Sequence, residues 1–412
     1  MTTIRSAVAA AALILSALSA VGQPSRQPDV ADPTLDPAKL AAASNNWFGA
    51  EMFVRLLASR GAAENLVFSP HSLAAALSLA APGAGGETAA AFVGVLKTAK
   101  IAPADMLARQ GALQKSLNGA SDVTLRIANG LWAAADTPLK GDYVAKVKLA
   151  LAAELAPLPA NAAEAAKRIN DWVNAQTKGA IAKLFERLPE NTRAVLVNAL
   201  HFKADWATGF EAAQTKPMPF HRAAGGDVSV AMMQRFDDGF RYRETAAYQA
   251  VLVPYRGERF QLVVVLPKPK VHAAELIQPL NLKELTGALG YRRAPGRLGL
   301  PKLDLTDNLQ LNAPLRAGGL DIAFTDRADF SGLAARPLLI SQVLQRTKLE
   351  IDEKGTTAAA ATGITMAPTS AREPVPPFTM ICDRPYLLLL QDSQSGAVLF
   401  MAYIGDPQAA GR

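Results

Sequence analysis

A stretch of small, uncharged residues near the C-terminal end constrains the fold more strongly than any other feature of this sequence. Residues 356–365 contain no charged residue, no proline and a single glycine. In a β-strand, Thr356, Ala358, Ala360 and Thr362 would share one face, and that face is small enough to enter a packed sheet. Residues 366–377 contain four prolines, which favour a loop. The pattern predicts an insertable stem, an exposed tip and a stiff return segment.

Considered alone, an Ala/Thr-rich tract of this kind is more often a plain helix or a linker. Here it follows a strand-like run at residues 344–351 and then Asp352, Glu353, Lys354 and Gly355. In this order, the run resembles the hinge of the reactive-centre loop in serpins. These are serine protease inhibitors that trap their target by strand insertion.

The resemblance covers about residues 40–407. Near the start, residues 65–73 read Asn-Leu-Val-Phe-Ser-Pro-His-Ser-Leu, which is similar to the serpin segment Asn-x-x-Phe-Ser-Pro-x-Ser. Further similar segments follow in the family's order at residues 83–88, 169–173, 177–181, 196–203, 253–257, 300–302, 328–332, 384–387, 396–401 and 405–407. Because of their order and spacing, the chain is identified as a member of the serpin family.

Membership implies an α+β serpin fold: a single domain with three β-sheets, eight or nine helices and an exposed reactive-centre loop. Hydrophobic periodicity agrees with a mixture of separate helices and antiparallel hairpins. It predicts helices at residues 40–60, 72–80 and 162–177, and strands at 194–200, 250–253, 261–266, 344–351, 386–390 and 397–404. After the first forty residues no Pro/Gly/Ser-rich or charged linker divides the chain, which favours one large domain.

The N-terminal residues are typical of an export signal. Arg5 precedes an apolar run at residues 7–18 and then small residues, so we expect a signal peptide at residues 1–22, cleaved after Ser19 or Gly22. Residues 23–39 are expected to be a flexible leader and residues 40–408 the serpin domain, with the reactive-centre loop at about 353–378. The protein is therefore expected to be secreted or periplasmic, since the apolar run is too short to span a bilayer. A retained N-terminal anchor is the alternative.

The resemblance assigns roles to two groups of residues. The loop hinge comprises Glu353, Gly355, Thr356, Thr357, Ala358, Ala359, Ala360, Ala361 and Thr362. The sheet-opening region comprises Ser69, Ser72, Asn198, Trp206 and Gln345. Thr357 stands where the family usually has glutamate, but it should face solvent. Gln345 stands where a histidine is common, which would remove that residue's pH sensitivity.

The scissile bond has two candidate positions. Counting the usual stem length from Gly355 places it between Thr369 and Ser370, which would suit an elastase-like or other small-pocket protease. The return segment is longer than in many serpins, so the register can slip. Cleavage between Arg372 and Glu373 would suit a trypsin-like enzyme, whose pocket carries a carboxylate. Thr369 is favoured.

Composition limits the other functional classes. The only cysteine, Cys382, excludes an internal disulfide and is expected to be a small buried hydrophobe. The formal charge of +7 comes from scattered lysines and arginines, so neither nucleic acid nor a membrane is an expected partner. No metal-ligand spacing, nucleophile motif or phosphate-binding loop is present, so we expect no metal, no cofactor and no catalytic residue, and the chain is predicted not to be an enzyme.

The expected function is suicide inhibition of a serine protease by a monomer. The protease attacks the loop and forms a covalent acyl complex, the stem then inserts into the central sheet, and the distorted protease cannot deacylate. An elastase-like target is favoured and a trypsin-like one is the alternative. Two other interpretations remain open: inhibition of a cysteine protease, and a non-inhibitory serpin acting as a binding or structural protein.

Overall fold

The computed structural model describes residues 35–98, 101, 103–356 and 377–408. Nine α-helices lie in these ranges: α2 (Pro37–Arg60), α3 (Pro70–Leu77), α4 (Gly86–Val95), α5 (Pro103–Asn118), α6 (Gly141–Leu151), α7 (Ala162–Gln176), α8 (Ala273–Leu276), α9 (Pro279–Thr286) and α10 (Asn312–Leu315). No helix in the described ranges is both long and apolar enough to cross a membrane.

Fifteen strands accompany these helices in the same ranges. The first eight are β1 (Leu66–Phe68), β2 (Thr124–Ala134), β3 (Glu154–Leu158), β4 (Ala194–Asp205), β5 (Lys216–His221), β6 (Asp227–Glu244), β7 (Tyr248–Pro254) and β8 (Phe260–Pro267). The others are β9 (Arg292–Pro301), β10 (Leu303–Gln310), β11 (Gln342–Ile351), β12 (Gly355–Thr356), β13 (Phe378–Ile381), β14 (Tyr386–Asp392) and β15 (Val398–Ile404). Every helix and strand named from periodicity is confirmed, and only their ends differ.

The strands form two sheets in the described part of the chain. Six strands make one sheet in the order β10-β11-β4-β2-β3, with the short β12 added to β4. The other sheet has nine strands in the order β1-β15-β14-β8-β7-β6-β9-β13, with β5 paired to β6. A third separate sheet was expected. β6 accounts for the difference, because its 18 residues continue through a bulge between Asp237 and Phe240 and pair with β5, β9 and β7 in turn.

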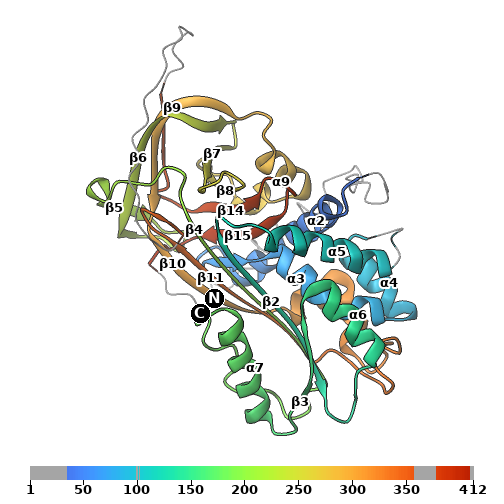
Figure 1. The fold of residues 1–412 in the computed structure, drawn as a ribbon. Coiled ribbons are helices and arrows are strands. Elements are labelled where there is room, and N and C mark those ends of the chain that lie inside the picture. Colours follow the sequence, from blue (N-terminus) through green and yellow to red (C-terminus); the bar gives the residue numbers. More distant parts are fainter. Residues whose placement is uncertain (1–34, 99–100, 102, 357–376, 409–412) are drawn as a thin grey trace, which may run out of the picture.

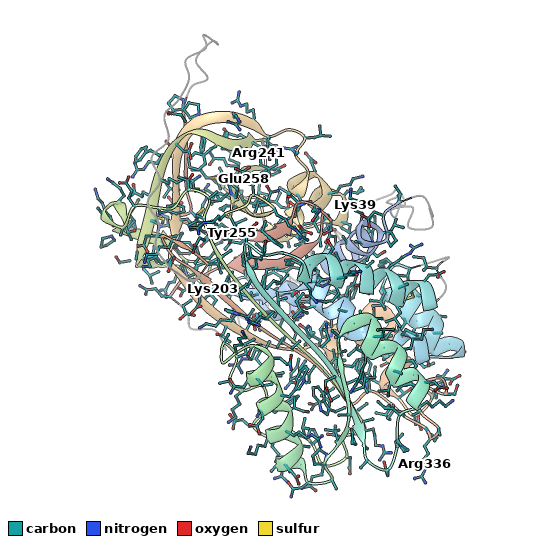
Figure 2. All side chains as sticks on the ribbon, viewed as in Figure 1. Lys39, Lys203, Arg241, Tyr255, Glu258 and Arg336 are labelled. Carbon is teal, nitrogen blue, oxygen red and sulfur yellow. The ribbon has the colours of Figure 1, made fainter. Side chains whose placement is uncertain are left out.

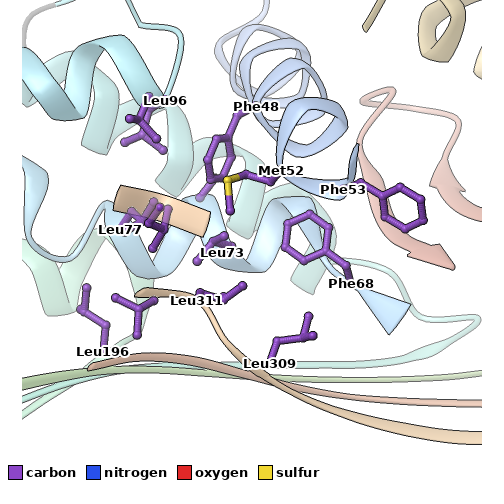
Figure 3. Packing of buried hydrophobic residues seen from close by; sticks show 14 of the residues in the cluster. Phe48, Met52, Phe53, Phe68, Leu73, Leu77, Leu96, Leu196, Leu309 and Leu311 are labelled. Atoms are coloured by element: carbon purple, nitrogen blue, oxygen red, sulfur yellow. The ribbon is translucent and has the colours of Figure 1, made fainter. Parts of the chain in front are cut away.

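Helices cover both faces of the six-stranded sheet. Figure 3 shows α2 and α3 lying over one face, where Phe48 and Leu73 pack towards Leu196 and Leu309. On the other face α7 packs against β2, and Trp172 meets Trp132 at a ring distance of 4.8 Å. Long strands of this sheet cross the middle of the molecule in Figure 1, with the curved nine-stranded sheet beyond one end of them. This arrangement gives the central strands β4 and β11 cover on both faces.

Local sequence sets the start of the two helices that lie over the sheet. The side chain of Asp36 accepts a hydrogen bond of 2.8 Å from the backbone N–H of Ala38, and Pro37 occupies the first turn of α2. Ser69 caps α3 in the same way, and Pro70 follows it. The Ser-Pro dipeptide therefore positions the chain at the point where it meets the central sheet.

The single cysteine is buried, as predicted. Cys382 follows β13 directly, and its backbone N–H continues the pairing by donating to the carbonyl oxygen of Gly299 at 2.9 Å. Burial raises the pKa of the thiol well above its ordinary value. A thiol in this environment stays protonated and unreactive.

Candidate functional site: a strand seam and its hinge

The site centres on two parallel neighbours, β4 and β11. Seven residue pairs join them, from Gln342 opposite Val195 to Lys348 opposite His201. We call this line of pairing the seam. Parallel pairing is slightly less stable per residue than antiparallel pairing. A strand entering the seam from β12 would run antiparallel to both neighbours, so it would replace one parallel ladder with two antiparallel ones.

The hinge lies at the end of the seam, where the chain turns back after β11. In this turn Asp352 Oδ1 accepts hydrogen bonds from the backbone N–H groups of Lys354 at 2.9 Å and Gly355 at 3.1 Å. Gly355 and Thr356 then form β12, which pairs antiparallel with Asp205 and Ala204 of β4. Gly355 and the first residue of the predicted stem, Thr356, are therefore already part of the sheet.

Close packing explains the glycine in this hinge. A β-carbon at Gly355 would overlap the backbone oxygen of Ala204, so only glycine permits this approach of the two chains. Thr356, which follows, is 1% exposed, and its hydroxyl lies 2.9 Å from the Tyr255 hydroxyl. Figure 2 shows Tyr255 in the interior of the molecule. Thr356 therefore occupies a buried, polar and small position.

Glu353 ties the hinge to two other parts of the chain. Its carboxylate accepts hydrogen bonds of 2.8 Å from Lys302 Nζ and from the Thr215 hydroxyl. Its backbone carbonyl accepts a bond of 2.7 Å from the N–H of Phe210. Burial alone would raise the pKa of Glu353, but the hydrogen bonds, with that from Lys302 the largest, hold the pKa below its ordinary value. The carboxylate is thus ionised at neutral pH.

Trp206 closes the same end of the seam. Its indole N–H donates to the carbonyl oxygen of Asp352 at 2.9 Å, and its backbone N–H donates to that of Lys354 at 2.8 Å. The indole stacks on the Tyr255 ring with 4.4 Å between ring centroids. Trp206 therefore contacts both the turn before the stem and the partner of the stem's first buried side chain.

A buried polar cluster lies further along the seam, centred on Gln345. The Gln345 amide bonds both backbone groups of Ser69, accepting from the N–H at 2.7 Å and donating to the carbonyl oxygen at 2.9 Å. A longer bond of 3.3 Å reaches Asn198 Oδ1 across the seam. Asn198 donates at 2.8 Å to Asn129 of β2. Gln345 is thus bound firmly to the α3 side and weakly to β4.

Two neighbours complete this cluster from α3. Ser72 donates its backbone N–H to the Ser69 hydroxyl at 3.2 Å, while its own hydroxyl has no partner among the described residues. His71 is fully buried, with Nδ1 at 3.3 Å from the side-chain nitrogen of Asn45. Burial lowers the pKa of His71 to about 4, so the ring is neutral at pH 7.

The predicted site residues fall into three groups. Glu353, Gly355, Thr356 and Trp206 meet at the hinge, whereas Ser69, Ser72, Asn198 and Gln345 meet in the lower cluster. The other predicted positions lie outside the described residues: Thr357, Ala358, Ala359, Ala360, Ala361, Thr362, Thr369, Ser370, Arg372 and Glu373. Their roles stay predictions.

Sequence reasoning missed the partners of the predicted residues. Tyr255, Lys302 and Thr215 bind the hinge, and Asn129 binds Asn198. Tyr255 and Lys302 did stand inside segments that were noted for their resemblance, at residues 253–257 and 300–302. Tyr255 directly follows β7, and Lys302 directly follows β9. This position at a strand end was the sequence signal that could have identified them as partners of the hinge.

The chain is similar to known proteins over most of its length. The family model described as "Serpin (serine protease inhibitor)" matches residues 43–407. An uncharacterized serpin-like protein of Thermococcus kodakarensis is 34% identical, with 84% of this chain and 81% of that protein covered. Serpin-Z1C of Triticum aestivum is 33% identical, with 84% and 91% covered. Among solved structures, the native state of the thermophilic serpin tengpin superposes with a TM-score of 0.81 at 26% identity, covering 91% and 96% of the two chains.

One prediction from the sequence needs correction. The chain was predicted not to be an enzyme. The family match supports only a general statement, that serpins are mostly protease inhibitors rather than catalytic enzymes. It does not address whether this chain is catalytic.

The family model spans nearly the whole folded part, and the relatives are more than 30% identical. The chain therefore belongs to the serpin family.

Proposed function

We propose that the protein is an exported suicide inhibitor of serine proteases, with an elastase-like enzyme as the favoured target. The observation that carries this proposal is the hinge. Gly355 and Thr356 already pair antiparallel with β4 at the end of the seam, so an extension of β12 would run along the line between β4 and β11. A non-inhibitory serpin would have no need of an entry point built from small residues.

The free energy for trapping would come from completing the sheet. Inserting a strand along the seven paired positions would add about one ladder of hydrogen bonds, at roughly 1 kcal/mol net for each bond. The gain is therefore on the order of 5–10 kcal/mol before any side-chain burial. Insertion draws the acylated protease along with the cleaved stem, and loss of its catalytic geometry prevents deacylation.

The site offers polar groups to the incoming stem. Tyr255 already binds the hydroxyl of Thr356, and the Ser72 hydroxyl lies buried and unpartnered among the described residues of the lower cluster. Breaking the 3.3 Å contact between Gln345 and Asn198 would separate the two sides there. The side-chain barrier to opening the seam at this depth is therefore small.

The test uses the mature protein with an elastase-like and a trypsin-like protease. We expect an SDS-stable complex and a released C-terminal peptide that starts at Ser370. A peptide starting at Glu373 would instead assign the bond after Arg372 and a trypsin-like target. Clean cleavage by both proteases without any complex would contradict suicide inhibition and favour a non-inhibitory serpin, provided that a cysteine protease also forms no complex.

A matched pair of hinge variants sharpens this test. Thr356→Arg would place a charge at a position that is 1% exposed, so the stem should insert too slowly and the protein should become a substrate. Thr356→Ser keeps the hydroxyl that bonds Tyr255 and should still form the complex. Equal complex formation by both variants would show that burial at this position does not control trapping.

Export is part of the same proposal. It is supported by Arg5 and the apolar run at residues 7–18. Expression of the full chain in a secreting host, followed by N-terminal sequencing of the exported protein, should give a first residue directly after Ser19 or Gly22. Retention of the intact N-terminus in the cell would contradict it.

A further inference from the structure

Strands β6 and β9 carry a row of arginines on one face of the nine-stranded sheet. Arg241 pairs opposite Arg293, and Phe236 pairs opposite Arg297. Arg293 and Arg297 are four residues apart on one strand, so they share a face, and Arg243 shares the face of Arg241. We call these five residues the arginine stripe. Figure 2 labels Arg241 among the side chains of this sheet.

Folding alone does not account for the central pair of the stripe. Arg241 and Arg293 are both exposed, and within the described chain neither side chain forms an ion pair or a hydrogen bond. Like charges placed directly opposite on neighbouring strands are destabilising. Nearby acids are engaged elsewhere, because Glu284 pairs with Arg243 and Asp237 pairs with Arg235.

No other acid of the bulge compensates this pair. Asp238, the remaining carboxylate there, forms no ion pair with any residue that the structure describes. Arg241 and Arg293 thus have no ion-pair partner among the described residues.

The stripe also presents an aromatic surface. Phe236 is 66% exposed, although most large apolar side chains of this protein are buried. The Arg297 guanidinium lies 5.4 Å from the centre of the Phe236 ring, and the side chain of Gln234 fixes it by a hydrogen bond. Arginine and aromatic residues are enriched at the energetic centres of protein interfaces. This composition fits a protein surface better than a polysaccharide, which would make little use of Phe236.

The position of the stripe indicates which protein would reach it. Arg297 pairs opposite Thr379 in β13, the first strand after the reactive-loop segment. Phe378 anchors that strand by stacking on Tyr242 with 3.9 Å between ring centroids. A protease that engages the loop segment would therefore lie next to this edge of the sheet.

We propose that the arginine stripe is a docking surface for an acidic patch on the target protease, an inference that rests on the proposed inhibitory function. Docking would bring the protease to the loop before acylation. Complementary charges at the rim of an interface act mainly on the association rate, and their effect falls as salt increases. The stripe would thereby select proteases with an acidic surface beside the active site.

The probe for this proposal is an elastase-class protease, used unmodified and with its lysines succinylated, which makes its surface acidic. Arg241→Ala/Arg293→Ala removes the central pair. Arg327→Ala/Arg336→Ala is the matched control, because it removes the same charge from another exposed region; Figure 2 places Arg336 at the far end of the molecule from Arg241. Circular dichroism would verify that all variants are folded.

Association rates would be measured for the active protease, and binding by interferometry for protease whose catalytic serine is blocked. With succinylated protease in about 20 mM salt, we expect the stripe variant to associate at least about fivefold more slowly than wild type. The control should change less than about twofold, and the difference should shrink at about 200 mM salt. Unmodified protease should discriminate less between the variants.

Three results would overturn the proposal. Equal slowing of both double variants would assign the effect to net charge. An unchanged association rate for the stripe variant would show that the stripe has no role in docking. Loss of heparin-oligosaccharide binding by the stripe variant, with a wild-type rate towards protease, would assign the stripe to a polysaccharide.

The binding measurement separates this proposal from the proposed function. If wild type forms a covalent complex but the stripe variant associates at the same rate, docking alone fails. If blocked protease binds through the stripe but no covalent complex forms, suicide inhibition alone fails.

Discussion

At the scale of single residues, Glu353 joins the hinge to Lys302 and Thr215, which belong to distant parts of the sequence. A family resemblance can mark such a glutamate, but it cannot supply its partners. The pairing makes the hinge sensitive to acid, because the carboxylate must be ionised to bind the ammonium group.

Acid should therefore weaken the hinge. The folded state holds the pKa of Glu353 below 4.5, so this contribution to stability is complete above that pH and is lost as pH falls through the folded-state pKa. Glu353→Gln should lower the melting temperature at pH 7, by the equivalent of about 1 kcal/mol for a partly exposed pair. Thermal melts at pH 7 and at low pH would measure this.

The matched control is Glu258→Gln, which changes an exposed glutamate in the β7–β8 turn. It should leave the melting temperature at pH 7 unchanged. If acid destabilises Glu353→Gln as much as wild type over the whole range, the carboxylate at position 353 is not the responsible group.

His71 should give a second pH dependence with a different range. Its folded-state pKa is about 4 against 6.5 in an unfolded chain, so only the unfolded state binds this proton between those values. Stability should then fall by up to about 3 kcal/mol as pH drops from 6.5 to 4. Proton NMR should show one histidine that titrates near pH 4 and is missing in His71→Gln.

The unfolding free energy measured as a function of pH provides an independent test. Between pH 4 and 6.5, His71→Gln should reduce the slope of the unfolding free energy against pH by the equivalent of up to one proton taken up on unfolding. A residual slope should remain from His201, whose pKa is also lowered by burial. A wild-type slope in His71→Gln would contradict the assignment.

At the scale of elements, the connection between α7 and β4 lies across the seam. The side chain of Asn170 in α7 bonds the backbone of Leu184 and Phe185, and Asn308 of β10 donates to the carbonyl oxygen of Leu184 at 3.3 Å. Arg346 of β11 donates to the carbonyl oxygen of Lys183. This connection spans from α7 to β10, and a strand entering the seam must pass beneath it.

Loosening this connection should speed insertion at the expense of stability. Leu184 is buried against the seam strands in the cluster that includes Val197 and Leu344. Leu184→Ala should therefore lower the unfolding free energy of the native protein by about 2–4 kcal/mol. The same change should shorten the time between loop cleavage and the change in tryptophan fluorescence, followed by stopped flow.

The control for this variant is Glu186→Ala, an exposed position in the same connection. It should leave both quantities near wild type. Slower insertion in Leu184→Ala would mean that the connection guides the strand rather than obstructs it.

At the scale of the whole molecule, the sequence predicted the elements better than their assembly. Helix α7 has apolar residues at helical spacing and strand β14 is a short, continuous apolar run, so local sequence is sufficient for both. The merging of two expected sheets depends on β6 continuing past its bulge, which its local pattern does not reveal. The burial of Thr356 depends on Tyr255, about a hundred residues away, and propensity contains no such information.

Under the proposed mechanism, the uncleaved protein should be less stable than the form in which the stem has completed the sheet. A cleaved loop that inserts between β4 and β11 would gain on the order of 5–10 kcal/mol. For a folded part of about 370 residues, this corresponds to a melting temperature at least roughly 5–10 °C higher. Calorimetry before and after cleavage of the loop by a protease that is not trapped would measure the difference.

Two variants decide whether insertion causes this gain. Thr356→Arg, cut at the same bond, should show a smaller increase, because a charge at this already buried position would disrupt the pairing of β12 with β4 from which insertion starts. Thr356→Ser should match wild type. An equal increase in all three would attribute the gain to release of the loop itself, and an absence of any increase would mean that the seam stays closed after cleavage. In that case the paired Gly355 and Thr356 would be a fixed edge of the sheet rather than the start of an entering strand.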